Sequence, residues 1–266
     1  MHPQISINTL CLPTAALGDH AEAVARLGAR GISPGVAAVL DFGVKETARS
    51  VRDVGLEVAT ITHLAFGYAT PQATREARER LLRTIDIAAE IGGHSVIMTT
   101  GGRCALSWAE AAEAFAEAMA PCAEAARAAG ITIGIEGTSH LYADVSIAHR
   151  LSDTAKLARM AGISVMLDTF ACWFDSDIEA AIAEAGPLIG LVQVSDYVYG
   201  DRGLPCRAVP GDGQSRLDRM IPAIAATGFN GYYDLEVIGP RLVAERAEAG
   251  LRRAADFVGA LLERKN

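Results

Sequence analysis

Eight short β-rich runs alternate with longer helical patterns from one end of the chain to the other. The short runs are rich in Val, Ile and Leu, whereas the segments between them carry apolar residues at the spacing of amphipathic helices. Strands joined through helices run parallel, so the alternation predicts an α/β fold with a parallel sheet. Strands are expected at 4–11, 31–38, 57–64, 95–100, 131–136, 164–169, 189–195 and 231–237, and helices at 15–29, 42–55, 71–92, 107–129, 146–161, 176–186, 216–228 and 241–264.

Eight β/α units in 266 residues is the count of a (β/α)8 barrel, the TIM barrel. An open, doubly wound sheet is the alternative. It is disfavoured because no GxGxxG follows the first strand and because polar residues end several strands rather than meeting at one switch point. No linker or low-complexity tract interrupts the pattern, so residues 1–266 are expected to form a single barrel domain. Glycine-containing breaks at 129–131, 161–163 and 227–231 are typical of helix ends.

Composition excludes several classes of function. Half of the residues are apolar, which is ample for a large core, and the net charge of −8 opposes binding to nucleic acid. No apolar stretch reaches the ~18 residues of a membrane span. The N-terminal segment lacks the features of a signal peptide, and the five scattered cysteines are typical of reduced thiols, so a cytoplasmic location is expected.

Four polar residues end or nearly end four different apolar strands: Glu136, Asp168, Gln193 and Glu236. Burying a carboxylate beside a hydrophobic strand is costly unless a cation or hydrogen bonds compensate it. Since the carboxyl ends of barrel strands share one face, these residues predict one oxygen-rich site, suited to Mg²⁺ or Mn²⁺. The alternative is that the acids cap helices or pair with arginines, and that Gln193 is a hydrogen-bonded residue of a barrel layer.

Four further residues are candidates for contact with a substrate. His63 ends the third predicted strand and is expected to face the mouth of the barrel, and His140 follows Glu136 in the next loop. Arg207 lies in the long segment 196–215, which reads as an ordered lid. Trp173 follows Asp168 and can supply an apolar wall. For each, the structural alternative is ordinary packing or a solvated polar group.

The segments IEGTSHLYADVS, VMLDTFACW, LVQVSDY, RAVPGDG and YDLEV resemble those of the xylose isomerase-like TIM barrel superfamily, the sugar phosphate isomerase and epimerase family related to tagatose 3-epimerase and inosose dehydratase. The resemblance covers essentially the whole chain. It implies a divalent metal held by Glu136, Asp168, Gln193 and Glu236, with Glu136 and Glu236 also acting as the catalytic acid and base. It further implies that homodimers can form.

The chain departs from the family pattern at two positions. Where the family has H-x-x-D, this chain has Gln193 followed by Asp196, and a histidine common after the aspartate is replaced by Ala171. Loss of both imidazoles makes the site all-oxygen and shifts its preference toward Mn²⁺ or Mg²⁺. The other interpretation is that metal binding has been lost.

The leading hypothesis is a metal-dependent isomerase or epimerase that removes a proton next to the carbonyl of a small polyhydroxylated substrate. In this hypothesis His63, His140 and Arg207 orient the substrate. A metal-dependent lyase that dehydrates a keto-sugar, glycoside or keto-cyclitol uses the same proton abstraction, so the sequence does not separate the two. A non-catalytic barrel that binds a small molecule is the third hypothesis. With one clear loop arginine near the site, an unphosphorylated substrate is expected.

Overall fold

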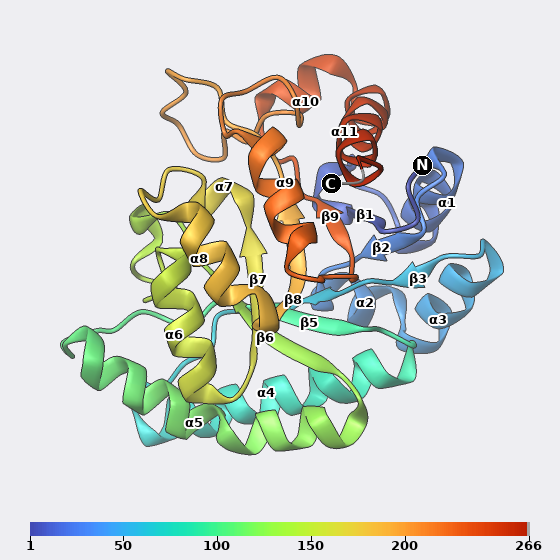
Figure 1. Cartoon of the computed structure of the whole chain (residues 1–266). Helices are drawn as coiled ribbons and strands as arrows, with labels where there is room; N and C mark the ends of the chain where they lie inside the picture. Colours follow the sequence, from blue (N-terminus) through green and yellow to red (C-terminus); the bar gives the residue numbers. More distant parts are fainter. Residues whose placement is uncertain (265–266) are drawn as a thin grey trace.

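The computed structural model describes residues 1–264 and contains nine parallel strand segments with helices around them (Figure 1). Their order in the sheet is β3-β2-β1-β9-β8-β7-β6-β5-β4. The strands are β1 (Ile5–Asn8), β2 (Gly31–Ser33), β3 (Glu57–Val58), β4 (Ile61–Thr62), β5 (Ser95–Met98), β6 (Thr132–Glu136), β7 (Ser164–Asp168), β8 (Ile189–Val194) and β9 (Tyr233–Leu235).

The two end strands of this order belong to one continuous piece of chain. β3 pairs with β2, β4 pairs with β5, and only Ala59 and Thr60 separate β3 from β4. The sheet therefore returns to its start and encloses a barrel of eight chain segments, as the alternation of patterns predicts. The prediction of a TIM barrel is confirmed.

Helices cover the outside of the strands (Figure 1). They are α1 (Leu17–Leu27), α2 (Val36–Phe42), α3 (Val44–Asp53), α4 (Pro71–Glu90), α5 (Trp108–Ala129), α6 (Leu151–Ala161), α7 (Thr169–Cys172), α8 (Ile178–Ala185), α9 (Leu217–Ala226), α10 (Pro240–Glu245) and α11 (Ala247–Leu262). Short 3-10 turns lie at Thr9–Cys11, His140–Tyr142 and Gly186–Leu188. No helix within residues 1–264 is long and apolar enough to cross a membrane.

Local signals place the helix ends close to where the sequence predicts them. α5 begins at a capping box, in which Ser107 and Glu110 satisfy each other's backbone N–H groups, and it ends at Gly130 with a left-handed φ of 71°. Gly162 ends α6 in the same conformation. Glycine is favoured at these positions because a Cβ atom is unfavourable at positive φ.

Three elements differ from the prediction. The second strand stops at Ser33 because Pro34 and Gly35 break it, and α2 begins where the strand was expected to continue. The third strand is interrupted at Ala59 and Thr60. The last helical pattern forms two helices, which meet at Arg246, whose φ is 74°.

Apolar side chains pack both outside and inside the barrel, and the polar residues at its mouth begin where the inner apolar layer ends. The large core lies between strands and helices, and a small separate cluster of Ile97, Met166 and Leu191, from β5, β7 and β8, lies inside the barrel. Alternate strand residues share a face, so Asp168 and Gln193 lie above Met166 and Leu191 on the inner side. Polar side chains thus follow directly on the apolar layer at the carboxyl ends of the strands.

Candidate functional site

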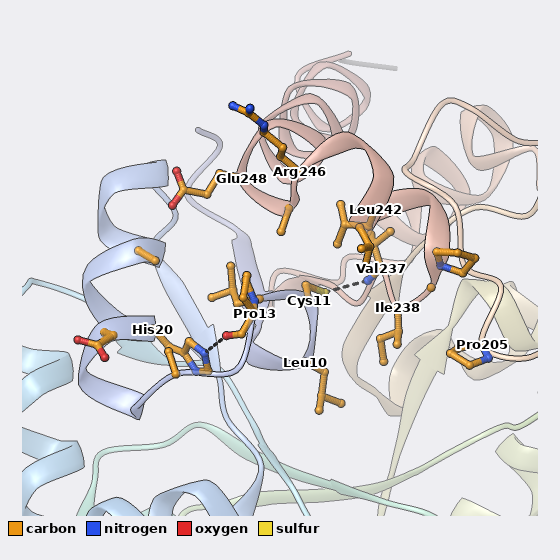
Figure 2. A pocket seen from close by; sticks show the side chains of 18 of the residues that line it. Leu10, Cys11, Pro13, His20, Pro205, Val237, Ile238, Leu242, Arg246 and Glu248 are labelled. Atoms are coloured by element: carbon orange, nitrogen blue, oxygen red, sulfur yellow. Dashed lines mark hydrogen bonds between the residues drawn. The ribbon is translucent and has the colours of Figure 1, made fainter.

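The carboxyl-terminal side of the barrel carries two cavities that share Pro205 and Ile238. The larger, of about 1020 Å³, lies between the segment after β1 and helix α10 (Figure 2). Its walls are mainly apolar, and its charged residues, such as Asp19 and Arg26, are exposed at its rim. The smaller cavity, of about 260 Å³, contains Glu136, Asp168 and Arg207. Chemistry that needs convergent buried charges therefore belongs to the smaller one.

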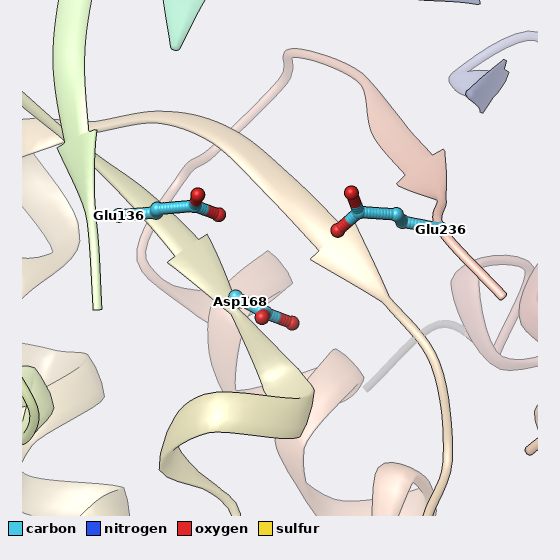
Figure 3. Close-up of side chains that lie close together, drawn as sticks. All are labelled: Glu136, Asp168 and Glu236. Atoms are coloured by element: carbon cyan, nitrogen blue, oxygen red, sulfur yellow. The ribbon is translucent and has the colours of Figure 1, made fainter. Parts of the chain in front are cut away.

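Three carboxylates meet at the mouth of the barrel (Figure 3). Glu136 ends β6, Asp168 ends β7 and Glu236 follows β9 directly. One oxygen of each lies within 4.8 Å of the others. Asp168 and Glu236 are buried, whereas Glu136 is half-buried and faces the cavity. The parallel register brings together acids that are far apart in the sequence.

Arg207 is the counter-charge of this cluster. Its Nη1 and Nη2 donate to the two oxygens of Asp168 at 2.9 and 2.8 Å, and Nη2 lies 3.2 Å from Oε2 of Glu236. Nη1 also donates to Oγ of Ser195 at 3.0 Å, and the guanidinium lies over the ring of Phe170. The fork geometry makes this a directed ion pair and not a loose surface contact.

Gln193 lies between the strands that carry Asp168 and Glu236. Its Nε2 donates to Oε2 of Glu236 at 2.8 Å, so it supplies a donor where the family pattern has an imidazole. Its Oε1 is buried and accepts no hydrogen bond from residues 1–264. An unpaired buried amide oxygen is costly, and a cation at the mouth would satisfy it.

Burial and mutual repulsion change the pKa values of the acids. Burial is the main cause that raises the pKa of Glu136 well above its ordinary value, and the negative charges of Glu236 and Asp168 raise it further. Burial also raises the pKa of Glu236, which Arg207 restrains to about 7. Burial and the neighbouring acids thus favour the protonated form of Glu136, whereas Arg207 favours the ionised form of Glu236.

The donor set fits a divalent cation. Asp168 and Glu236 share one guanidinium, and Glu136 adds a third carboxyl group that can release its proton when a cation binds. The unpaired Oε1 of Gln193 belongs to the amide that donates to Glu236 and is a further acceptor beside them. Hard ions such as Mg²⁺ and Mn²⁺ bind sets of oxygen atoms of this kind. Glu136, Asp168, Gln193 and Glu236, as the sequence suggested, are the residues that would hold it.

Asp196 organises the loop that delivers Arg207, a role that the sequence did not reveal. Its carboxylate accepts hydrogen bonds from the backbone N–H groups of Gly211, Gly213 and Ser215, each at 3.0 Å. Its backbone pairs with Ala208, next to Arg207. The signal was the Asp-rich, Gly-rich composition of 196–215, which indicates an ordered loop but not its anchor.

The structure does not bring every predicted substrate contact to the cavity. His63 is buried, and its Nδ1 lies 2.9 Å from Oγ1 of Thr84 in α4, so the expectation that it faces the mouth was wrong. The reason is the break in the third strand, after which Thr62 pairs with the inward Ile97 and His63 points outward. Burial lowers the pKa of His63 to about 4, which keeps the ring neutral.

Within residues 1–264, neither His140 nor Trp173 belongs to the wall of the cavity. His140 is exposed at the start of a 3-10 turn, between the lining residues Ser139 and Tyr142. Trp173 stacks on Tyr197 with ring centroids 5.4 Å apart. Phe170 and Ala171 provide the apolar wall next to Asp168. Arg207 is thus the predicted substrate contact that does line the cavity.

A comparison with known families decides where this chain belongs. The model of the xylose isomerase-like TIM barrel family matches residues 21–261. The chain belongs to this family. The resemblance seen in the sequence is therefore confirmed, together with the fold that it implied. No curated protein matches the chain.

Several solved structures share the fold across almost the whole chain. The protein SMc04130 from Sinorhizobium meliloti 1021 is 23% identical, with a TM-score of 0.89 and 98% of each chain covered. An L-ribulose 3-epimerase is 21% identical, with a TM-score of 0.82 and 98% and 95% of the two chains covered. The IOLI protein with a bound zinc atom is 15% identical, with a TM-score of 0.85 and 98% of each chain covered. At these identities the similarity establishes the fold alone.

Proposed function

We propose that the protein is a divalent-metal-dependent isomerase or epimerase of a small polyhydroxylated carbonyl compound. The observation that carries the proposal is the convergence of Glu136, Asp168 and Glu236 within 4.8 Å at the mouth of the barrel. Two solved structures of similar fold are described as an L-ribulose 3-epimerase and a D-psicose 3-epimerase, which supports a sugar-like substrate.

The two glutamates divide the proton transfer between them. Glu236, which follows β9 and lies beside Arg207, takes the proton from the carbon next to the carbonyl, and the C–H electron pair moves toward the carbonyl oxygen. Glu136, at the end of β6, returns a proton to that carbon. The two glutamates lie at the ends of different strands and can reach opposite faces of the substrate. Return of a proton to the opposite face inverts the configuration at the carbon. A bound divalent cation would supply positive charge beside the oxygens of the substrate.

The wall of the cavity limits the substrate. Its volume of about 260 Å³ suits a small molecule, and the hydroxyl groups of Thr99, Thr138, Ser139 and Tyr142 can meet those of a sugar. Arg207 is the sole Lys or Arg among the described lining residues, and it is committed to Asp168. A free polyhydroxylated ketone fits this charge balance better than a phosphorylated one.

The test is proton exchange with solvent. The metal-free protein, supplied with Mn²⁺, is incubated in D₂O with a panel of free pentuloses and hexuloses, and deuterium next to the carbonyl is followed by NMR. We expect exchange that chelator stops and that Glu236→Gln abolishes. Glu184→Gln, on the outer surface of α8, is the matched control. Unchanged exchange in Glu236→Gln contradicts the proposal, and a product lighter by one water identifies a dehydratase instead.

A further inference from the structure

Arg207 binds the carboxylate oxygens that a metal ion would need as ligands. Both oxygens of Asp168 accept hydrogen bonds from its guanidinium. Oε2 of Glu236 forms an ion pair with Arg207 and accepts a hydrogen bond from the Gln193 amide. The side chain of Arg207 is only 15% exposed. The positive charge of this centre is thus already supplied by the chain.

A divalent ion and this guanidinium oppose each other at such short range. Three carboxylate oxygens lie within 4.8 Å of one another, so an ion among them would sit next to Arg207 while the arginine keeps its present contacts. Like charges at this spacing repel strongly in a partly buried site. Binding of the ion therefore requires the guanidinium to give up part of its contact with Asp168 and Glu236.

The backbone of Arg207 is fixed, so this exchange concerns the side chain alone. Its N–H donates to the carbonyl of Ile238 at 3.0 Å, and Ala208 pairs with Asp196 in both directions. Asp196 in turn holds the loop that follows. Displacement of the guanidinium would therefore move the side chain of Arg207 and not its backbone.

We propose that Arg207 is a built-in cation that neutralises this centre in the metal-free protein and competes with a divalent ion for Asp168 and Glu236. The inference rests on the proposed metal site and adds a property of this chain's own residues. Gln193 strengthens the competition, because its amide donates to Glu236 where an imidazole would bind the metal. Metal binding is therefore weak until the guanidinium is displaced.

The experiment measures Mn²⁺ binding without substrate. Free Mn²⁺ is followed by EPR during titration of the metal-free full-length protein, its Arg207→Met variant and the control Arg219→Met, which removes an exposed arginine of α9. We expect Arg207→Met to bind Mn²⁺ about tenfold more tightly than the unaltered protein, because the competing cation is gone. Arg219→Met should bind as the unaltered protein does.

Melting temperatures give a second readout. Metal-free Arg207→Met should melt below the unaltered protein, because three acids then lack a counter-charge, and Mn²⁺ should raise its melting temperature by more. If the methionine variant fails to fold, Arg207→Lys replaces it, with an affinity expected to rise by less because lysine lacks the fork. Equal or weaker Mn²⁺ binding in the variants, or no binding in any of these proteins, overturns the inference. Absence of proton exchange with the affinity order intact would instead reject the proposed function alone.

Discussion

The two ends of the barrel each join an arginine to carboxylates, with opposite consequences. At the amino-terminal end, Glu57 accepts from Nε of Arg30 at 2.9 Å and from the hydroxyl of Tyr232 at 2.5 Å, and it lies 3.2 Å from Nε2 of His94. These donors lower the pKa of Glu57. At the mouth, one arginine pairs with two of three neighbouring acids, Asp168 and Glu236, and the pKa values of Glu136 and Glu236 rise.

The difference lies in burial and in the ratio of charges. The side chain of Glu57 is 36% exposed and has two hydrogen-bond partners on each oxygen, whereas that of Glu236 is 8% exposed and lies beside two other acids. A satisfied, solvated carboxylate stabilises the fold, but an under-compensated buried one is prepared for a proton or a cation. Glu57 thus stabilises the fold at one end, and the acids at the other end are the candidates for chemistry.

The largest expected effect is on proton transfer. Glu136→Gln should reduce solvent-deuterium exchange by about 10²- to 10⁴-fold, because it removes a proton-transfer group. Glu57→Gln, its counterpart at the other end, should leave the exchange rate unchanged. Deuterium exchange measured by NMR under saturating Mn²⁺ tests both variants. An equal loss of exchange in Glu136→Gln and Glu57→Gln would contradict the different roles of the two ends.

The pH dependence of stability should differ in sign between the two ends. For Glu236, a pKa raised from 4.5 to about 7 favours the folded state at low pH, and on the order of 3 kcal/mol is lost as the pH rises through this window. For Glu57 the lowered pKa gives stability above 4.5, which is lost as the pH falls. Urea unfolding of the metal-free protein with chelator, compared with Glu236→Gln and Glu57→Gln, measures each contribution. Parallel curves for protein and variants would show that the acids are not perturbed.

The anchor of the loop should have a moderate effect. Asp196→Asn leaves one acceptor oxygen for four backbone N–H groups, those of Tyr197, Gly211, Gly213 and Ser215, and should lower the free energy of unfolding by roughly 2–3 kcal/mol. Because the anchor lies next to Arg207, Mn²⁺ affinity should change as well. Urea unfolding checks the first effect, and Asp201→Asn, at an exposed ion pair in the same loop, is the control.

The smallest expected effect concerns the choice of metal. Gln193→His restores an imidazole and removes the amide that donates to Glu236. Affinity for Zn²⁺ relative to Mg²⁺ should rise by about tenfold, since imidazole favours the softer ion. Competition titrations against a zinc indicator measure it, and an unchanged ratio would place residue 193 outside the ligand set.

The sequence predicted the acids well because parallel strands share one carboxyl end. Once Glu136, Asp168 and Glu236 are placed after their strands, the register of the barrel must bring them together. His63 failed the same reasoning, because a two-residue break after β3 changes which side of the strand it occupies. The alternation of side chains between the two faces of a strand predicts their direction only while the strand is continuous.

The sequence did not predict which acid Arg207 pairs with. Its segment has the composition of an ordered loop, but the contact of Asp196 with this loop and the ion pair between Arg207 and Asp168 form only when the chain is folded. Gln193 could be placed on its strand, but the choice of Glu236 as its partner follows only from the side-chain geometry.

Anomalous diffraction from a crystal soaked in Mn²⁺ shows whether the three acids hold the ion. We expect one strong manganese peak among the carboxylates of Glu136, Asp168 and Glu236, with the guanidinium of Arg207 moved from its two contacts with Asp168. No peak between these acids at saturating Mn²⁺, with Arg207 still joined to Asp168, would contradict it.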